Sequence, residues 1–198
     1  DIKFQANGVE KASISSAGAF TSTSIDATKL SGALPAIDGS ALTNLPAGGK
    51  VLQVVSLTST TTFSTTSGTL QNTGINLVIT PTLATSKIMV FVTASLGSTT
   101  GGYPAFGIRR NATDIGTGTD LGSRRGASGA GYEGNGNAIT TVASNHLDSP
   151  ATTSATTYRI TLNGRDGYTA WINRSYSDSD AVYTVRPVST ITLMEIGV

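Results

Sequence analysis

Apolar and polar residues alternate most clearly between Lys87 and Leu96. A period of two is typical of a β-strand, because successive side chains point to opposite faces of the sheet. One face of this segment is entirely apolar, and the other is only partly apolar. Such a strand is expected inside a β-sandwich or at a subunit contact. The first face carries Ile88, Val90, Val92, Ala94 and Leu96, and the second carries Met89, Phe91, Thr93 and Ser95.

Further strands are predicted by the same alternation and by runs of Val, Ile, Thr and aromatic residues between turn signals. Residues with high helix propensity never recur at helical spacing over ten residues, so helices are not expected. The pattern predicts an all-β, jelly-roll-like antiparallel β-sandwich head over residues 50–198. The stronger strands span 51–57, 74–80, 158–162, 167–173 and 189–198, and the weaker ones span 60–65, 105–110, 138–144 and 181–185.

The first 49 residues have a different pattern, in which single apolar residues are separated by turns such as Asn7-Gly8 and Asp38-Gly39. A single chain cannot bury anchors this sparse, whereas three chains wound around one axis bring each anchor against its symmetry mates. We therefore expect residues 1–49 to form a trimeric fibrous stalk; a flexible tether is the alternative. The apolar anchors are Phe4, Val9, Ile14, Phe20, Ile25, Leu30, Leu34, Ile37, Leu42 and Leu45.

Composition removes several classes of function. The 198 residues include 32 threonines, 23 serines and 23 glycines, whereas charged residues make up 13% and the net charge is +1. Without a basic excess, nucleic acid is not an expected partner, and no apolar run approaches the roughly 20 residues of a membrane helix. The chain has no Cys and one His, which excludes disulfides and thiolate chemistry. Because the chain begins with Asp1, we expect a piece of a longer polypeptide or a chain with a leader segment.

Two short motifs resemble parts of known active sites. Residues 129–134 match the GxGxxG pattern of dinucleotide sites, but no helix can begin at the following Asn-Gly-Asn to receive a pyrophosphate. His146, Asp148 and Ser149 lie close together before Pro150. We interpret them as one turn, since Asp and Ser commonly bind local backbone N–H groups, and not as a catalytic triad.

The acidic residues give no clear catalytic or metal site. Asp178 and Asp180 can hold a hard cation together with Asn173 and Asp166, but no EF-hand spacing is present, so a solvated turn is the simpler interpretation. Glu195 lies in a predicted strand, where we expect it to pair with an arginine of its own or a neighbouring chain. We therefore predict a non-enzymatic protein with no catalytic residue, no metal site and no cofactor.

Loops with tyrosine and arginine are the candidate contact surfaces. Residues 116–137 contain many glycines, and a loop of this length in a small domain is usually functional or mobile. Tyrosines in polar loops suit stacking on sugars as well as protein contacts. The Arg124-Arg125 pair is suited either to acidic sugars and phosphates or to bridging subunits. The candidate contact residues are Tyr103, Arg124, Arg125, Tyr132, Tyr176 and Tyr183.

Several segments resemble the fibre proteins of tailed phages. The stretches 4–9 and 13–20 are similar to the strand-and-turn repeat of their stalks. The segment KLSGALPAIDGSALTNL, residues 29–45, resembles a linker common in fibres of phages that infect aquatic bacteria. The head resembles the globular tips of these proteins at 51–55, 147–158 and 189–196.

This resemblance implies a homotrimeric external appendage of a virion, partnered by tail or capsid proteins. It implies attachment to a host surface glycan or protein and carries over no catalytic residue. Membrane insertion is not implied. A head or capsid decoration fibre with a purely structural role is the first alternative. A tailspike depolymerase and a secreted module similar to the C1q or TNF trimers are further alternatives.

Overall fold

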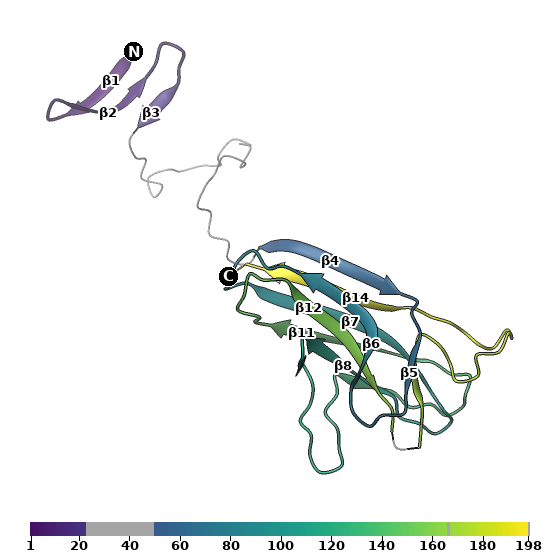
Figure 1. Cartoon of the computed structure of the whole chain (residues 1–198). Coiled ribbons are helices and arrows are strands. Elements are labelled where there is room, and N and C mark those ends of the chain that lie inside the picture. Colours follow the sequence, from purple (N-terminus) through teal and green to yellow (C-terminus); the bar gives the residue numbers. More distant parts are fainter. Residues whose placement is uncertain (23–49, 166, 198) are drawn as a thin grey trace. The chain divides into compact units, whose positions relative to one another are not determined.

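The computed structural model describes residues 1–22, 50–165 and 167–197. The chain divides into two compact units, Asp1–Leu45 and Pro46–Val198, and each is considered by itself. In the described residues the regular structure consists of β-strands, with no helix, and every strand pair is antiparallel (Figure 1). The expectation of an all-β antiparallel protein is therefore confirmed.

Two sheets form the second unit. In the first sheet the strand order is β4-β14-β7-β13-β5. β14 and β13 pair with successive parts of one edge of β7, and β11 pairs with its other edge, which also gives the order β4-β14-β7-β11. In the second sheet the order is β10-β8-β12-β6, and β9 also pairs with β8. The strands are β4 (Val51–Ser59), β5 (Phe63–Thr65), β6 (Gln71–Ile79), β7 (Lys87–Ser98), β8 (Ala105–Arg110), β9 (Thr113–Ile115), β10 (Gly129–Ala130), β11 (Thr140–Asp148), β12 (Thr156–Asn163), β13 (Ala170–Ile172) and β14 (Ser189–Ile196).

The chain crosses between the two sheets repeatedly. β4 and β7 belong to the first sheet, whereas β6 and β8 belong to the second; after β10, the strands β11, β12 and β14 alternate again. The alternating apolar residues of both sheets point toward each other and form one core. The fully apolar face predicted for β7 is part of it. The core consists of Ile75, Ile79, Ile88, Val90, Val92, Ala94, Leu96, Phe106, Ile108, Tyr158, Ile160, Leu162, Ala170, Ile172, Ile191 and Leu193.

The sandwich has a proximal end, where the chain enters the head at Lys50, and a distal end opposite it. At the proximal end, Lys50 accepts a hydrogen bond from Gly197 N at 2.9 Å, and Ile196 lies opposite both Val51 and Lys87. At the distal end lie the connections that follow β7, β10, β12 and β13. Figure 1 shows these connections at the end of the sheets away from the start of β4. The longest of these connections, from β13 to β14, therefore lies opposite the point where the chain enters the head.

An inter-sheet cluster replaces the turn that we predicted around His146. β11 continues through His146 to Asp148, so that prediction was wrong. Asp148 is buried and accepts hydrogen bonds from Arg110 Nη1 at 2.8 Å and from the Tyr158 hydroxyl at 2.7 Å. Asp148 belongs to the first sheet and its two partners to the second, so the cluster ties the sheets together near the proximal end. Burial, followed by the Asp148 carboxylate, raises the pKa of Tyr158.

The first unit is a three-stranded sheet in the order β1-β2-β3, with β1 at Ile2–Ala6, β2 at Val9–Ile14 and β3 at Phe20–Ser22. Asn7 and Gly8 both have positive φ, as a two-residue type I′ hairpin turn requires. A register shift between Phe4 and Gln5 leaves one additional residue in β2. This bulge changes the alternation, so that Val9 and Ile14 lie on the same face.

That face carries the predicted stalk anchors that the structure describes. Ile2, Ile14 and Phe20 form one row across the three strands, and Phe4 and Val9 lie beside it on the same face. Phe4 is 49% exposed, Val9 56% and Phe20 55%, so one chain leaves this surface uncovered. The anchors Ile25, Leu30, Leu34, Ile37, Leu42 and Leu45 lie outside the described residues.

Besides the strand expected at 60–65, which begins only at Phe63, two predicted strands differ clearly from the structure. The strand expected at 167–173 begins only at Ala170, because Tyr168 N closes a turn onto Arg165 O at 2.7 Å. The strand expected at 181–185 is wrong, since Thr184 N bonds to Ala181 O at 3.0 Å within a turn. In both places the side chains resemble those of a strand, but local hydrogen bonds close a turn before any neighbouring strand is available.

Candidate functional site

Tyr103 and Tyr132 meet at the distal end of the head. Their ring centroids lie 5.0 Å apart with a tilt of 42°, and both side chains are about half exposed. The Arg165 guanidinium lies 5.2 Å from the centre of the Tyr103 ring. Three separate connections, which follow β7, β10 and β12, therefore contribute to one exposed aromatic and cationic surface.

Glu133 links the connection that carries Tyr132 to the connection that carries Tyr103. Its carbonyl oxygen accepts a hydrogen bond from Gly101 N at 2.7 Å, and its N–H donates to Gly102 O at 3.0 Å. Its side chain is fully buried; Oε1 accepts from Thr140 Oγ1 at 2.8 Å, while Oε2 has no partner among the described residues. Burial raises the pKa of this carboxyl group. The backbone of Glu133 thus joins the two connections that carry the tyrosines, while its buried carboxyl group is destabilised when it ionises.

We expect Glu133→Gln to stabilise the head at neutral pH. A carboxyl group with a raised pKa in the folded state contributes stability below its unfolded pKa, and that stability is lost as the pH rises through the folded pKa. The neutral amide avoids this loss, so the variant should unfold at a higher urea concentration than wild type at pH 8. The gain should vanish near pH 4. Urea titrations at both pH values test this, and a variant less stable than wild type at pH 8 would contradict it.

A second cluster lies on the connection from β13 to β14. Tyr176 packs on Trp171 with centroids 5.3 Å apart, and the Arg174 guanidinium lies 5.6 Å from the Trp171 ring centre. Asp178 contacts Arg174 at 3.5 Å and accepts two hydrogen bonds from Arg186, one of them from Nε at 2.8 Å. The Arg186 hydrogen bond lowers the pKa of Asp178. The interpretation of Asp178 as a solvated turn residue was therefore wrong.

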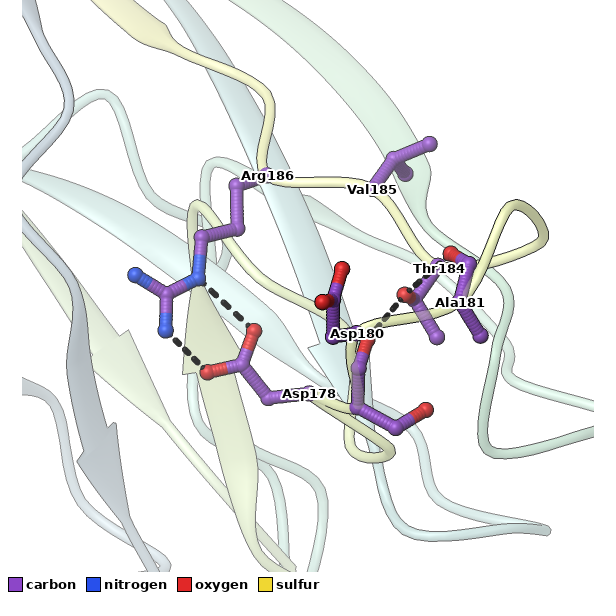
Figure 2. Close-up of a pocket in the computed structure, with 7 residues that line it drawn as sticks. Asp178, Asp180, Ala181, Thr184, Val185 and Arg186 are labelled. Carbon is purple, nitrogen blue, oxygen red and sulfur yellow. Dashed lines mark hydrogen bonds and ion pairs between the residues drawn. The ribbon is translucent and has the colours of Figure 1, made fainter.

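A depression of about 310 Å³ lies beside this ion pair. Figure 2 shows the Arg186 guanidinium and the Asp178 carboxylate pointing toward each other, with Asp180 and Thr184 nearby. Thr184 Oγ1 donates within the turn, to Ala181 O at 2.8 Å. The loop beyond the ion pair is exposed and apolar, with Val182 fully exposed and Tyr183 62% exposed. The loop is therefore fixed at its base by the ion pair and leaves Val182, Tyr183 and Val185 exposed.

The glycine-rich segment after β9 carries the two predicted arginines. Arg125 Nη1 lies 3.3 Å from Asp120 Oδ2, and Asp120 Oδ1 accepts a hydrogen bond from Gly126 N at 2.6 Å. That backbone hydrogen bond, more than Arg125, lowers the pKa of Asp120. Arg124 Nε donates weakly to the carbonyl oxygen of Leu121, at 3.4 Å. Asp120 thus shapes the segment, while both guanidinium groups stay largely available.

The candidate residues therefore fall into three groups. Tyr103 and Tyr132 are in contact, Arg124 and Arg125 share the glycine-rich segment, and Tyr176 lies near Tyr183 in sequence on the last connection. Sequence analysis missed Arg165 and Arg174, which lie over aromatic rings. For Arg165 the available signal was a bulky cation between two glycines, Gly164 and Gly167.

The residues considered for catalysis or metal binding are used otherwise. In the GxGxxG segment, β10 is followed by loop residues, and the described chain has no helix there. Asn173 is fully buried, where its amide bonds to backbone carbonyls. Across the described residues, no group of three or more His, Asp or Glu side chains is placed to hold a metal ion. The same part of the chain has no helix of the length and apolarity that a membrane span needs.

Glu195 does not pair with an arginine in the described part of the chain. It is fully buried and accepts hydrogen bonds from Gln53 Nε2 at 2.6 Å, Thr82 N at 2.7 Å and Thr82 Oγ1 at 2.8 Å. Burial alone would raise the pKa, but these hydrogen bonds outweigh it and lower the pKa to about 2. Glu195 therefore fixes the connection between β6 and β7 and has a structural role at the proximal end.

Comparison with known proteins identifies no family. No protein-family model matches the chain, and no curated protein matches it. A solved structure titled "Structure of infectious bursal disease virus Gx strain" is similar over 74% of this chain, with 10% identity and a TM-score of 0.39. The match spans 38% of that viral chain. At this TM-score the likeness carries no argument about function.

Proposed function

We propose that the chain is a non-enzymatic virion fibre protein, a homotrimer that attaches a phage to its host. In this proposal residues 1–49 form the stalk and residues 50–198 form a jelly-roll head, in line with the strand orders β4-β14-β7-β11 and β6-β12-β8-β10. The loops of the head bind a glycan or protein of the host surface. The resemblance of residues 29–45 to phage-fibre linkers supports the same proposal.

The observation that carries the proposal is the position of the exposed aromatic and cationic loops. Tyr103, Tyr132 and Arg165 lie at the distal end, opposite Lys50, where the chain enters the head. A domain held at one end by a stalk presents its other end to a partner. Half-exposed tyrosines beside arginines are typical of contact surfaces for proteins and sugars.

Trimer formation is supported by the uncovered apolar face of the first unit, with Phe4 and Phe20 each about half exposed. The outer face of the first sheet adds a second neutral surface. There Val54, Met194, Met89 and Leu147 lie directly opposite one another across four strands. Neither surface is suited to stay in water, whereas three copies can bury both, and three heads convert weak contacts into avidity.

Light scattering on the full chain tests the proposal. We expect the mass of three chains, and a Pro46–Val198 fragment measured in parallel shows whether the head alone also forms trimers. A single-chain mass for the full chain would contradict the fibre. Gold-labelled antibodies against the head then separate the alternatives on particles: labels at tail tips support attachment, whereas labels over the capsid favour a decoration fibre.

A further inference from the structure

Two adjoining depressions lie beside the aromatic pair, between the glycine-rich segment and the connections that follow β5 and β12. The first, of about 200 Å³, is bordered by Arg109, Asp114, Asp120 and Asn163. The second, of about 340 Å³, is bordered by Arg165 and by the backbone of several glycines. Gly68 and Arg125 border both depressions, so the two adjoin, and together they are called the groove below.

The guanidinium groups of this groove differ in how many of their hydrogen-bond donors are already used. Arg109 donates to both oxygens of Asp114, at 2.7 and 3.0 Å, and also to Leu70 O at 3.2 Å. Arg125 has a single long contact with Asp120 at 3.3 Å. The Arg165 guanidinium has no hydrogen bond to any described residue and stacks on Tyr103. The second depression is therefore flanked by two guanidinium groups with unused donors, which favour an anionic group.

The first depression offers acceptors instead. Asn163 is 5% exposed, and its Oδ1 accepts no hydrogen bond within the described part of the chain. A buried amide oxygen without a donor is costly, and a hydroxyl group of a ligand would satisfy it. Asp120 keeps lone pairs free because its side chain is 61% exposed. Donors and acceptors along one groove match the hydroxyl groups of sugars, each of which both donates and accepts.

We infer that this groove binds an acidic sugar polymer, that is, a chain of hexoses carrying carboxylate or phosphate groups. The inference rests on the proposed attachment function and names the chemistry of its ligand. Arg125 and Arg165 bind the anionic group, and Asn163 accepts a hydrogen bond from a neighbouring hydroxyl. Tyr103 and Tyr132 extend the groove with rings on which the apolar face of a further sugar stacks.

The charges of the groove disfavour two other ligands. A neutral sugar would leave the donors of Arg125 and Arg165 without a counter-charge. A densely charged polyanion such as single-stranded DNA would place phosphates beside Asp114 and Asp120, which repel them. An anionic group on every sugar or every second sugar, with hydroxyls between, fits both the cationic and the acidic borders.

Binding of the full chain to paired ligands tests this inference. The probes are oligomers of galacturonate, matched oligomers of galactose, a hexose-phosphate polymer and a single-stranded oligonucleotide. We expect binding to the galacturonate or the hexose-phosphate probe, and the stronger of these two identifies the anionic group. Binding should weaken with added salt, because ionic attraction is screened.

Three matched variants locate the contact. Arg125→Gln and Arg165→Gln should each weaken binding about tenfold or more, since each removes a hydrogen bond to a charged group. Arg124→Gln removes the same charge from the same segment but does not border the groove, so it should change binding less than about threefold. All three arginines lie at exposed positions, so we expect the three variants to fold. Unchanged thermal unfolding temperatures would confirm this.

Several results would overturn the inference. These are equal binding of galactose and galacturonate oligomers, equal binding of the oligonucleotide, or an equal loss in Arg124→Gln. If the wild type adheres to bacterial cells but binds none of the acidic sugars, the groove assignment fails and the attachment function stands. If the chain has a single-chain mass and binds neither cells nor sugars, the proposed function fails as well.

Discussion

Replacing Glu195 by glutamine should lower the free energy of unfolding by about 3 kcal/mol at pH 7. Both carboxylate oxygens accept hydrogen bonds, Oε2 from Gln53 and Oε1 from Thr82. The Glu195 pKa falls from 4.5 to about 2 on folding, and each pKa unit corresponds to about 1.4 kcal/mol. In the variant, the new amide group meets the Gln53 amide, which cannot turn around because it also donates to Thr80 O at 2.7 Å.

The pH dependence gives an independent check. A carboxyl group with a lowered pKa contributes its stability above the unfolded pKa, and that stability is lost as the pH falls through the folded pKa. Wild type should therefore lose about 3 kcal/mol between about pH 5 and pH 2 through this group, and the variant should not. Urea unfolding followed by the fluorescence of Trp171 measures both profiles.

Two further glutamates serve as controls. Glu133 is equally buried but has one unpaired oxygen, so its glutamine variant should become more stable at high pH, opposite in sign to Glu195→Gln. Glu10 is exposed and paired with Lys3, and its glutamine variant should leave the stability of the head unchanged. Equal stability of wild type and Glu195→Gln at pH 7 would show that the three hydrogen bonds to this carboxylate contribute nothing.

The strands of the core could be predicted from sequence because their side chains obey local alternation. β7 is the clearest case, since its inward residues from Ile88 to Leu96 are apolar at every second position and are buried in the structure. In β14 only the central inward residues, Ile191 and Leu193, are apolar, because the buried Glu195 and Ser189 are polar. The bounds of β11 were less accurate. Asp148 and Ser149 before Pro150 have the composition of a turn, but Arg110 and Tyr158 on the facing sheet hold Asp148 at the end of the strand.

The candidate site was less predictable because its contacts join residues far apart in sequence. Arg165 reaches Tyr103 over a connection between different strands, and no local pattern indicates that pair. Asp178 and Arg186 are eight residues apart across a loop that resembled a strand. Tyrosine and arginine content indicated which loops to consider, whereas the topology of the sandwich decides which of them lie together.

Replacing Asn173 by alanine should lower the free energy of unfolding by about 4 kcal/mol. This loss is as large as that expected for Glu195→Gln, or larger. Asn173 lies where β13 ends, and its side-chain amide donates to Ser59 O at 3.0 Å and Thr61 O at 2.8 Å, while its Oδ1 accepts from Ser189 Oγ at 2.6 Å. Alanine would leave these buried groups without partners, at about 1–3 kcal/mol for each unsatisfied group. The residue also has a φ of 62°, which asparagine tolerates better than alanine does.

Two variants separate these causes. Asn173→Gly relieves the backbone strain but not the lost hydrogen bonds, so it should be about 1 kcal/mol less destabilising than alanine. Asn111 also has positive φ, at 50°, but it is exposed, and its side chain accepts a single hydrogen bond, from Thr157 N. Asn111→Ala should therefore cost only about 1 kcal/mol. If urea unfolding gave the same loss for Asn111→Ala and Asn173→Ala, backbone conformation would account for the effect. That result would mean that the buried Asn173 amide, which bonds to the end of β4 and the start of β14, does not contribute to stability.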